Sequence, residues 1–486
     1  MTELAQKPAG VLENAYITAG IEKAAATYEV RSPATGAVVG TAAACGAAEA
    51  RAAADLAVTA FENWKARTAF ERSEVLRRWY ELILEDEEAL GPLIATEMGK
   101  ALKEARGEVT YAANFVKFYA EEAIRIYGDT VPAASPDRRI MVPRQPVGPV
   151  FAITPWNFPA GMITRKAAPA LAAGCSVVLK PAEQTPFTAL RLAELWLEAG
   201  GEPGTLQVLP AADPREVSET LIEDSRIRKL AFTGSTEVGK LLYAQAAPTM
   251  KRISLELGGH APFVVFADAD LDVAVEHAVG SKFRNAGQTC VCANRLIVHE
   301  DVAEEFASRF AAAASRLQVG DPLSESTDLG PLVSQAGFDK VNRHVTDALT
   351  RGAEAVIGGK PAEVEGGSDL FYTPTVLTGV TEDMLIMNEE TFGPVAPIIT
   401  FTDDSEAVRL ANDTPFGLAA YMFTRDVGRA FRVSEALDYG IVGVNDGMPS
   451  VPHAPFGGVK ESGLGREGGK WGIEEVLDVK YVSLGL

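Results

Sequence analysis

The sequence predicts an α/β protein with two successive α/β units, and two patterns along the chain support this prediction. Residues 47–127 carry apolar side chains at every third or fourth position and are rich in Ala, Leu and Glu, as amphipathic helices are. From residue 147 onward, short apolar runs of strand type alternate with helical patterns. Such alternation favours mostly parallel sheets that are covered by helices.

The expected elements follow in order along the chain. The segment "GDTVPAASPDRRI" ends the helical region with Pro, Gly and Asp. Strands are expected in "VGPVFAITP", "SVVLK", "TLQVLP" and "KLAFTG", and helices in "PFTALRLAELWLEAG", "EVSETLIED" and "STEVGKLLYAQA". A second alternation runs from "APFVVF" to "GLAAYMFT". The tail "EEVLDVKYVSLGL" is expected to form one edge strand, able to pair with another subunit.

Composition excludes several classes of protein. The chain has 486 residues, a formal net charge of −21 and only four Cys. A chain of this length builds its core without disulfides, and so few Cys favour a reducing compartment. The acidic charge repels nucleic acid and anionic lipid, so neither is an expected partner. Apolar runs of the ~20 residues that a membrane-spanning helix needs are absent, as is a secretory signal, so we expect a cytoplasmic protein.

Two segments carry signals for a nucleotide. In "KLAFTGSTEVGK", Gly234 permits a sharp turn and Ser235 caps a helix whose free N–H groups suit a phosphate. A plain glycine turn into a capped helix explains that segment equally well. In "VVLKPAEQTP", Lys180 and Glu183 follow a buried strand, where a carboxylate can accept both hydroxyls of a ribose and repel a 2′-phosphate. An ordinary surface Lys–Glu pair is the alternative.

The stretch "FRNAGQTCVC" places two of the four Cys among small polar residues. Such surroundings suit a reactive thiol at Cys290, whereas free Cys is more often a small buried hydrophobe. Glu256 lies in the apolar segment "ISLELGGHAPFVVF", where burial raises a carboxyl pKa toward the range of a general base. Asn157 in "TPWNFP" offers a fixed amide donor for an oxyanion, or serves only as a turn residue.

Seven segments occur in one order along nearly the whole chain: "PWNFP", "VVLKPAEQTP", "FTGSTEVG", "LELGGHAPF", "NAGQTCVCANR", "EETFGPV" and "APFGGVKESGLGRE". In these segments the chain closely resembles the NAD(P)-dependent aldehyde dehydrogenase superfamily. The resemblance implies an aldehyde dehydrogenase-like α/β fold of three parts, assembled as a homodimer or homotetramer. These parts are a Rossmann-like cofactor domain (residues 1–125 and 147–257), an α/β catalytic domain (258–465) and a small β oligomerisation element (126–146 and 466–486).

The resemblance also implies roles for single residues. Cys290 is the implied nucleophile, with Asn157 at the oxyanion, Glu256 activating water and Lys166 near the path of that water. Glu256 also favours hydrolysis to a free acid over transfer to coenzyme A. NAD is the expected cofactor because of the carboxylate of Glu183, and NADP stays open. The implied cofactor contacts are Thr154, Trp156, Lys180, Glu183, Gly234, Ser235, Glu390 and Phe392.

Within the superfamily the chain is most similar to succinate-semialdehyde dehydrogenases, through "GMITRKAAPALAAGCSVVLKPAEQTP" and "FRNAGQTCVCANR". Arg165 and Arg284 match two arginines that bind the distal carboxylate of the substrate in that group, and Ser450 matches a serine of the same pocket. Two guanidinium groups near a thiol select an anionic aldehyde, unless each pairs with a local carboxylate. The loop "GMPSVPHAP" departs from the group's pattern with three prolines and a histidine. Glutarate semialdehyde, or another short anionic aldehyde, therefore stays open.

Further expectations concern the other cysteines, metals and alternative functions. Cys292 matches a cysteine that pairs with the catalytic one as an oxidation switch, and a bridge at this spacing would be strained and reducible. Cys45 and Cys175 lie in Ala-rich segments and are expected to be structural. The five His show no metal-ligand spacing, so no metal is expected. The alternatives are an uncharged or aromatic aldehyde as substrate, and a non-catalytic oligomeric protein that keeps the fold.

Overall fold

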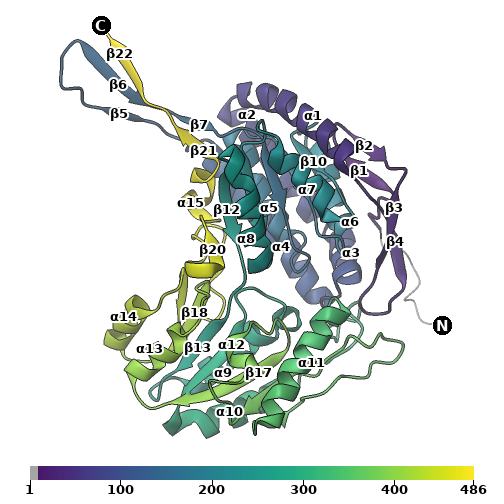
Figure 1. Ribbon diagram of the computed structural model, residues 1–486, viewed down its shortest axis with the longest axis vertical. Helices are drawn as coiled ribbons and strands as arrows, with labels where there is room; N and C mark the ends of the chain where they lie inside the picture. Colours follow the sequence, from purple (N-terminus) through teal and green to yellow (C-terminus); the bar gives the residue numbers. More distant parts are fainter. Residues whose placement is uncertain (1–8) are drawn as a thin grey trace.

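The computed structural model describes residues 9–486. The first eight residues, where the absence of a secretory signal was predicted and where the predicted cofactor domain begins, lie outside the described residues. Two large sheets lie one above the other along the long axis of the molecule, and a small sheet of three strands projects from one end (Figure 1). The predicted α/β class is confirmed.

The first sheet has the strand order β2-β1-β10-β9-β8-β11-β12-β20. Its five central strands are parallel, and β1 on one side and β20 on the other pair antiparallel to them. The edge strand β2 pairs antiparallel with β1. The chain leaves β8 toward β9 on one side and returns to β11 on the other, so the order reverses between β8 and β11. The strands are β1 (Ala15–Ile17), β2 (Ile21–Lys23), β8 (Val150–Ile153), β9 (Val177–Lys180), β10 (Leu206–Val208), β11 (Lys229–Thr233), β12 (Arg252–Glu256) and β20 (Gly463–Leu464).

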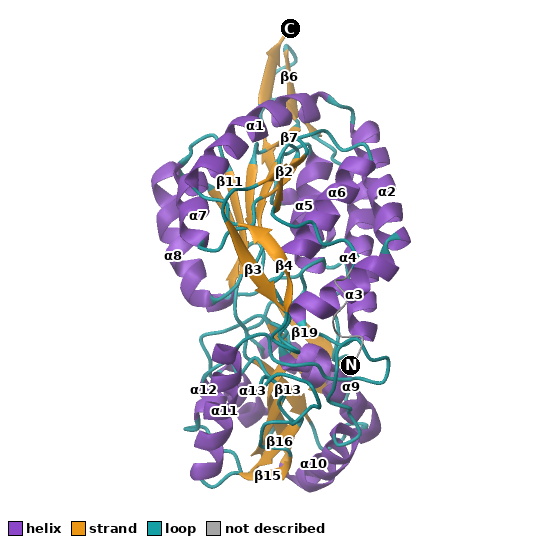
Figure 2. Ribbon diagram, turned by 90° about the vertical axis from the view of Figure 1, so that its right-hand side faces the viewer, coloured by secondary structure: helices purple, strands orange, loops and turns teal. Residues whose placement is uncertain are grey.

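Helices cover both faces of this sheet (Figure 2). The predicted helical region 47–127 forms four helices, of which α1 lies on one face and α2 to α4 on the other. The first face has α1 (Ala47–Ala66), α7 (Pro214–Glu223), α8 (Thr236–Ala246) and η1 (Ala247–Thr249), and the second has α2 (Ala69–Glu85), α3 (Glu87–Met98), α4 (Leu102–Ala123), α5 (Gly161–Ala173) and α6 (Pro186–Glu198).

The second sheet has the order β15-β16-β17-β14-β13-β18-β19, parallel except for β15. Its strands are β13 (Ala261–Val265), β14 (Ala293–His299), β15 (Glu354–Ile357), β16 (Thr375–Thr378), β17 (Val395–Phe401), β18 (Ala419–Phe423) and β19 (Ile441–Val444). Its helices are α9 (Leu271–Phe283), η2 (Arg284–Gly287), α10 (Glu300–Ala314), α11 (Gln335–Thr350), α12 (Leu385–Asn388), α13 (Asp404–Asn412) and α14 (Val427–Ala436). Apolar side chains of α9 and α10 pack in one core and those of α13 and α14 in another.

The small sheets join distant parts of the chain. β5 (Asp129–Val131), β6 (Arg138–Val142) and β22 (Val482–Gly485) form the projecting sheet, and β7 (Arg144–Pro146) pairs with β21 (Leu477–Val479). The hairpin of β3 (Thr27–Arg31) and β4 (Val38–Ala43), the turn η3 (Lys460–Ser462) and helix α15 (Gly469–Glu474) complete the fold.

The prediction of one strand over residues 474–486 was wrong. The segment begins in α15 and then forms two short strands, because β21 pairs with β7 whereas β22 pairs with β6. Pro143 separates those two partners and has no N–H to continue a ladder. Its carbonyl accepts the N–H of Lys480, at 3.0 Å.

Candidate active site

The predicted site residues gather at the carboxyl ends of the parallel strands of the first sheet. The reversal of strand order between β8 and β11 opens a crevice there, which is the usual place for a ligand in such a sheet. Thr154, Trp156 and Asn157 follow β8, Lys180 ends β9, Gly234 and Ser235 follow β11, and Glu256 ends β12.

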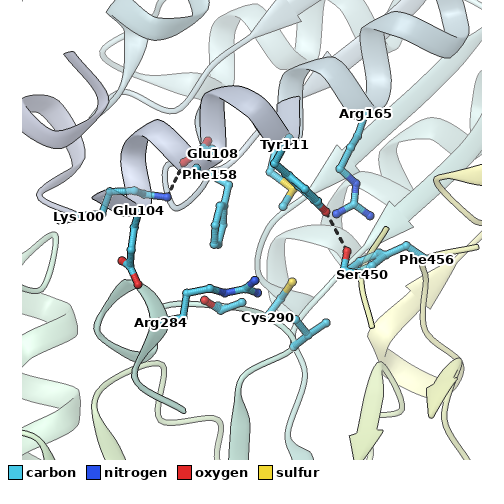
Figure 3. Close-up of a pocket in the computed structure, with 14 residues that line it drawn as sticks. Lys100, Glu104, Glu108, Tyr111, Phe158, Arg165, Arg284, Cys290, Ser450 and Phe456 are labelled. Atoms are coloured by element: carbon cyan, nitrogen blue, oxygen red, sulfur yellow. Dashed lines mark hydrogen bonds and ion pairs between the residues drawn. The ribbon is translucent and has the colours of Figure 1, made fainter. Parts of the chain in front are cut away.

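Cys290 borders two cavities that the sequence could not distinguish. A cavity of about 370 Å³ is lined by Cys290 together with Trp156, Asn157, Gly234, Ser235, Glu390 and Phe392. A second cavity, of about 280 Å³, is lined by Cys290 together with Arg165, Arg284 and Ser450 (Figure 3). The thiol thus stands between the residues predicted to bind cofactor and those predicted to bind substrate. Thr154, Lys180 and Glu183 are not among the residues lining either cavity.

Residues that line the larger cavity could hold part of a nicotinamide dinucleotide. Ser235 caps the 11-residue helix α8 by accepting from the N–H of Val238 at 3.3 Å, so the start of the helix faces the cavity where a phosphate would bind. The Trp156 and Phe392 rings meet edge to face at 5.6 Å and provide an apolar wall. Glu390 accepts from the N–H of Gly259 at 3.1 Å, and burial raises its pKa to about 7. Its carboxylate suits the hydroxyls of a ribose.

Lys180 and Glu183 form the ion pair that was the alternative to a ribose site. Their side chains approach to 3.4 Å, and Lys180 also donates to the Pro181 carbonyl at 3.0 Å. Burial lowers the pKa of Lys180. The Glu183 side chain remains 43% exposed, so its carboxylate is accessible to a ligand even though it is paired.

The surroundings of Cys290 differ from those of Cys292. Burial raises the pKa of the Cys290 thiol to about 12, although the guanidinium groups of Arg165 and Arg284 oppose this rise. Cys292 is buried, and its thiol donates to the carbonyl of Lys282 at 3.5 Å. Both thiols are free in this structure, and their disulfide stays a prediction. Cys45 and Cys175 are buried, which agrees with a structural role.

Gly259 lets the turn between β12 and β13 pass close to Cys290. A Cβ at this position would stand 2.5 Å from the carbonyl oxygen of Cys290, so a side chain would displace the loop that carries Cys290. Gly259 therefore has a steric reason in this fold.

Asn157 is held with its amide beside Cys290. Its Nδ2 donates to the carbonyl of Gln288 at 3.1 Å, which uses one of the two amide hydrogens. The other hydrogen is available to an oxyanion in the cavity that Asn157 and Cys290 line together.

Glu256 lies in a buried cluster of charges. Within residues 9–486, neither of its carboxylate oxygens has a hydrogen-bond partner. Burial, and then the neighbouring charge of Glu467, raises the pKa of Glu256 well above its usual value. Burial acts in the same direction on Glu467, but Lys166 and Arg165 outweigh it and hold the pKa of Glu467 low. Lys166 forms an ion pair with one oxygen of Glu467, and Arg165 Nε lies 2.9 Å from the other.

The smaller cavity contains several residues that the sequence analysis missed. The hydroxyls of Tyr111 and Ser450 are hydrogen-bonded at 2.8 Å, and Lys100 is paired with Glu108 over the Phe158 ring. Figure 3 shows Glu104 and Glu108 on one helix above the Arg284 segment. The only signal for them in the sequence was their spacing along a helix, which the surface of any amphipathic helix shares.

Residues 9–486 contain neither a cluster of metal ligands nor a helix able to cross a membrane. Groups of three or more His, Cys, Asp or Glu able to hold a metal ion are not found among these residues. In the same part of the chain, every helix is too short or too polar to cross a bilayer.

Known proteins resemble the chain in sequence and in fold. The model of the Aldehyde dehydrogenase family matches residues 21–482. Glutarate-semialdehyde dehydrogenase of Pseudomonas putida is 52% identical over 458 residues, which cover 94% of either chain. Succinate-semialdehyde dehydrogenase (NADP⁺) GabD of Escherichia coli K12 shows the same identity and coverage. The crystal structure of succinate-semialdehyde dehydrogenase from Burkholderia pseudomallei, 50% identical, matches 100% of both chains with a TM-score of 0.96. In sequence and in fold, the chain belongs to the aldehyde dehydrogenase family.

Proposed function

We propose that the protein oxidises a short aldehyde bearing a carboxylate to the corresponding acid with NAD, and that succinate semialdehyde is the first candidate. The observation that carries this proposal is the pair of guanidinium groups, Arg165 and Arg284, lining the cavity into which Cys290 opens. Within residues 9–486, Nη2 of Arg165 and Nε of Arg284 are buried donors without a hydrogen-bond partner. A carboxylate satisfies such donors with charge-assisted bonds.

The first half of the mechanism takes place at Cys290. Its thiolate adds to the aldehyde carbon and forms a thiohemiacetal. The oxygen of this intermediate accepts hydrogen bonds from the free Nδ2 hydrogen of Asn157 and from the backbone N–H of Cys290. Ser235, Glu390 and the apolar wall of Trp156 would hold a nicotinamide dinucleotide, which would supply a hydride acceptor when bound. Loss of the aldehyde hydrogen as hydride leaves a thioester on Cys290.

The second half of the mechanism depends on Glu256. Its carboxylate takes a proton from a water molecule that attacks the thioester, so the acid leaves and the Cys290 thiolate is regenerated. The raised pKa of Glu256 makes it a stronger base than an ordinary carboxylate. Lys166 acts indirectly, because its ion pair keeps Glu467 charged beside Glu256.

Comparing two aldehydes tests the substrate assignment. We expect kcat/KM with NAD to be at least about a hundredfold higher for succinic semialdehyde than for butanal, which lacks the carboxylate; this equals roughly 2.7 kcal/mol. Arg284→Ala should remove most of that preference and change butanal oxidation less than about threefold. Arg284→Lys keeps the positive charge but loses the planar guanidinium group with its paired N–H donors. It should therefore keep only part of the preference that Arg284→Ala removes.

Arg165 gives a less selective variant, because Arg165→Ala also removes a partner of Glu467. We therefore expect it to lower kcat for both aldehydes. If kcat/KM of the parent enzyme is about equal for succinic semialdehyde and butanal, the substrate is not selected by its charge. Aldehyde oxidation itself would not be contradicted. Uncharged or aromatic aldehydes, which suit the Phe158 and Phe456 rings of the cavity, would then be the candidates.

Glutarate semialdehyde is the second candidate for the substrate. The relative from Pseudomonas putida carries that name at 52% identity, and its substrate is one methylene longer. One methylene in an apolar pocket changes kcat/KM by about 10- to 200-fold. Measuring kcat/KM for both semialdehydes therefore decides between them.

Glu183 is the basis for proposing NAD over NADP. We expect kcat/KM for NAD to exceed that for NADP by about tenfold or more, since the Glu183 carboxylate repels a 2′-phosphate. Glu183→Ala should raise kcat/KM for NADP about tenfold, because it also frees the Lys180 ammonium from its ion pair. Steady-state kinetics with each cofactor measure both effects. The Escherichia coli relative is named for NADP, and a parent enzyme that prefers NADP would refute the NAD proposal.

The division into domains and the assembly are also proposals. We propose that the two large sheets belong to the cofactor and catalytic domains with the predicted boundaries, in a cytoplasmic homodimer or homotetramer. Exposed apolar side chains on the projecting sheet, on β21 and on the link between β21 and β22 support a subunit contact there. They are Met141, Val479, Tyr481 and Leu484.

A further inference from the structure

The segment that carries Arg284 has an unfavourable backbone conformation. Asn285 and Ala286 both have φ of 53°, in the left-handed region, and Gly287 follows at 75°. Asn tolerates this region, but it is unfavourable for Ala because the Cβ comes too close to the backbone there. Two successive residues of this kind persist only where their surroundings hold them, and such sites are often functional.

Glu104 provides the contact that holds this turn from the other side of the cavity. It lies in the first turn of α4, and its two carboxylate oxygens accept from the backbone N–H of Asn285 at 3.1 and 3.0 Å. In Figure 3, Glu104 reaches from its helix down to the segment bearing Arg284. The nearby Lys100 is already paired with Glu108.

Hydrogen bonds of Asn285 connect this turn to the proposed oxyanion site. Its Nδ2 donates to the carbonyl of Asn157 at 3.1 Å and to that of Gln288 at 3.2 Å. Gln288 donates back to the Asn285 carbonyl at 3.1 Å and accepts from Asn157 Nδ2. Asn285, whose N–H is bonded to Glu104, is thus also bonded to the proposed oxyanion donor Asn157. It directly follows Arg284 of the substrate cavity in the sequence.

We propose that Glu104 is a positioning residue for Arg284 and for the loop leading to Cys290. Its side chain has the length needed to accept a hydrogen bond from the Asn285 N–H. Its negative charge matters less for this role than its length. This inference rests on the proposed function where it concerns the substrate carboxylate. Its effect on the loop itself does not depend on which aldehyde is oxidised.

Two conservative variants separate reach from charge. Glu104→Gln keeps the length and one acceptor but loses the charge, whereas Glu104→Asp keeps the charge and is one methylene too short. We expect Glu104→Asp to lower kcat/KM about thirtyfold for succinic semialdehyde and about threefold for butanal, since small misplacements of this kind are costly. Glu104→Gln should stay within about threefold of the parent for both aldehydes. Glu121→Gln, on the exposed end of the same helix, is the matched control.

Alkylation of Cys290 by iodoacetamide gives a readout that needs no aldehyde. We expect the rate to change at least threefold in Glu104→Asp and to match the parent in Glu104→Gln. A parent enzyme without preference for succinic semialdehyde would refute the proposed substrate, and this rate would still decide the role of Glu104. Equal losses for both aldehydes in both variants would indicate a merely structural residue. Loss of activity in Glu104→Gln with activity retained in Glu104→Asp would indicate a role of charge. Either result overturns the proposal.

Discussion

Cys290→Ala is expected to lower kcat for aldehyde oxidation by about 10⁴- to 10⁶-fold, the range seen when an enzyme loses its nucleophile. The structure explains why no neighbouring group can replace it. Cys290 is the one cysteine, among the four of the chain, that lines both cavities, whereas Cys292 is buried with its thiol turned to the Lys282 carbonyl. Steady-state production of reduced cofactor measures the loss.

Cys292→Ala, two residues away, is the matched control and should retain kcat within about threefold. Alkylation gives a second test with a defined pH dependence. Because the thiolate reacts and burial raises the Cys290 pKa to about 12, the rate in the parent should rise about tenfold per pH unit up to pH 10. Activity that survives in Cys290→Ala would contradict the role of Cys290 as the nucleophile. Alkylation that levels off near pH 7 would contradict the raised pKa of its thiol.

Much of the fold could be predicted because its signals are local. The strands β9, β10 and β11 and the helices α6, α7 and α8 appear where strand and helix patterns alternate in the sequence. Helix α5 was missed, because its 13 residues are all buried and it therefore lacks the polar face that marks an amphipathic helix. Strands β1 to β4, of three to six residues, are too short for a clear period.

The site was predicted where unusual residues stand in unusual surroundings. A carboxylate in an apolar strand, such as Glu256, can be recognised from the sequence alone. The same holds for Cys290 among small polar residues. Glu104 and Glu467 cannot be recognised in this way, because each looks like an ordinary charge on a helix or loop. Their contacts are with distant partners, Asn285 across the cavity and the Arg165–Lys166 pair, which only the fold brings near.

Glu256→Gln has the second large expected effect and acts on a different step. The amide cannot take a proton from water, but Cys290 and Asn157 are untouched, so the thioester should form and then persist. We expect a burst of about one equivalent of reduced cofactor per active site and a steady-state rate lower by about 10²- to 10⁴-fold. Rapid mixing with absorbance at the reduced nicotinamide band measures both phases.

The pH profile tests whether Glu256 is the base independently of the burst. A carboxyl acts as a base only when it is deprotonated, so kcat of the parent should rise with pH as Glu256 loses its proton. Burial and Glu467 raise the Glu256 pKa, so this rising limb of the profile should lie above the pH range in which carboxyl groups usually titrate. Glu256→Gln should lack this limb. Glu467→Gln removes a negative neighbour and frees Lys166 and Arg165, so it should move the limb to lower pH. If Glu256→Gln turns over without a burst and keeps the parent's profile, another group must activate the water.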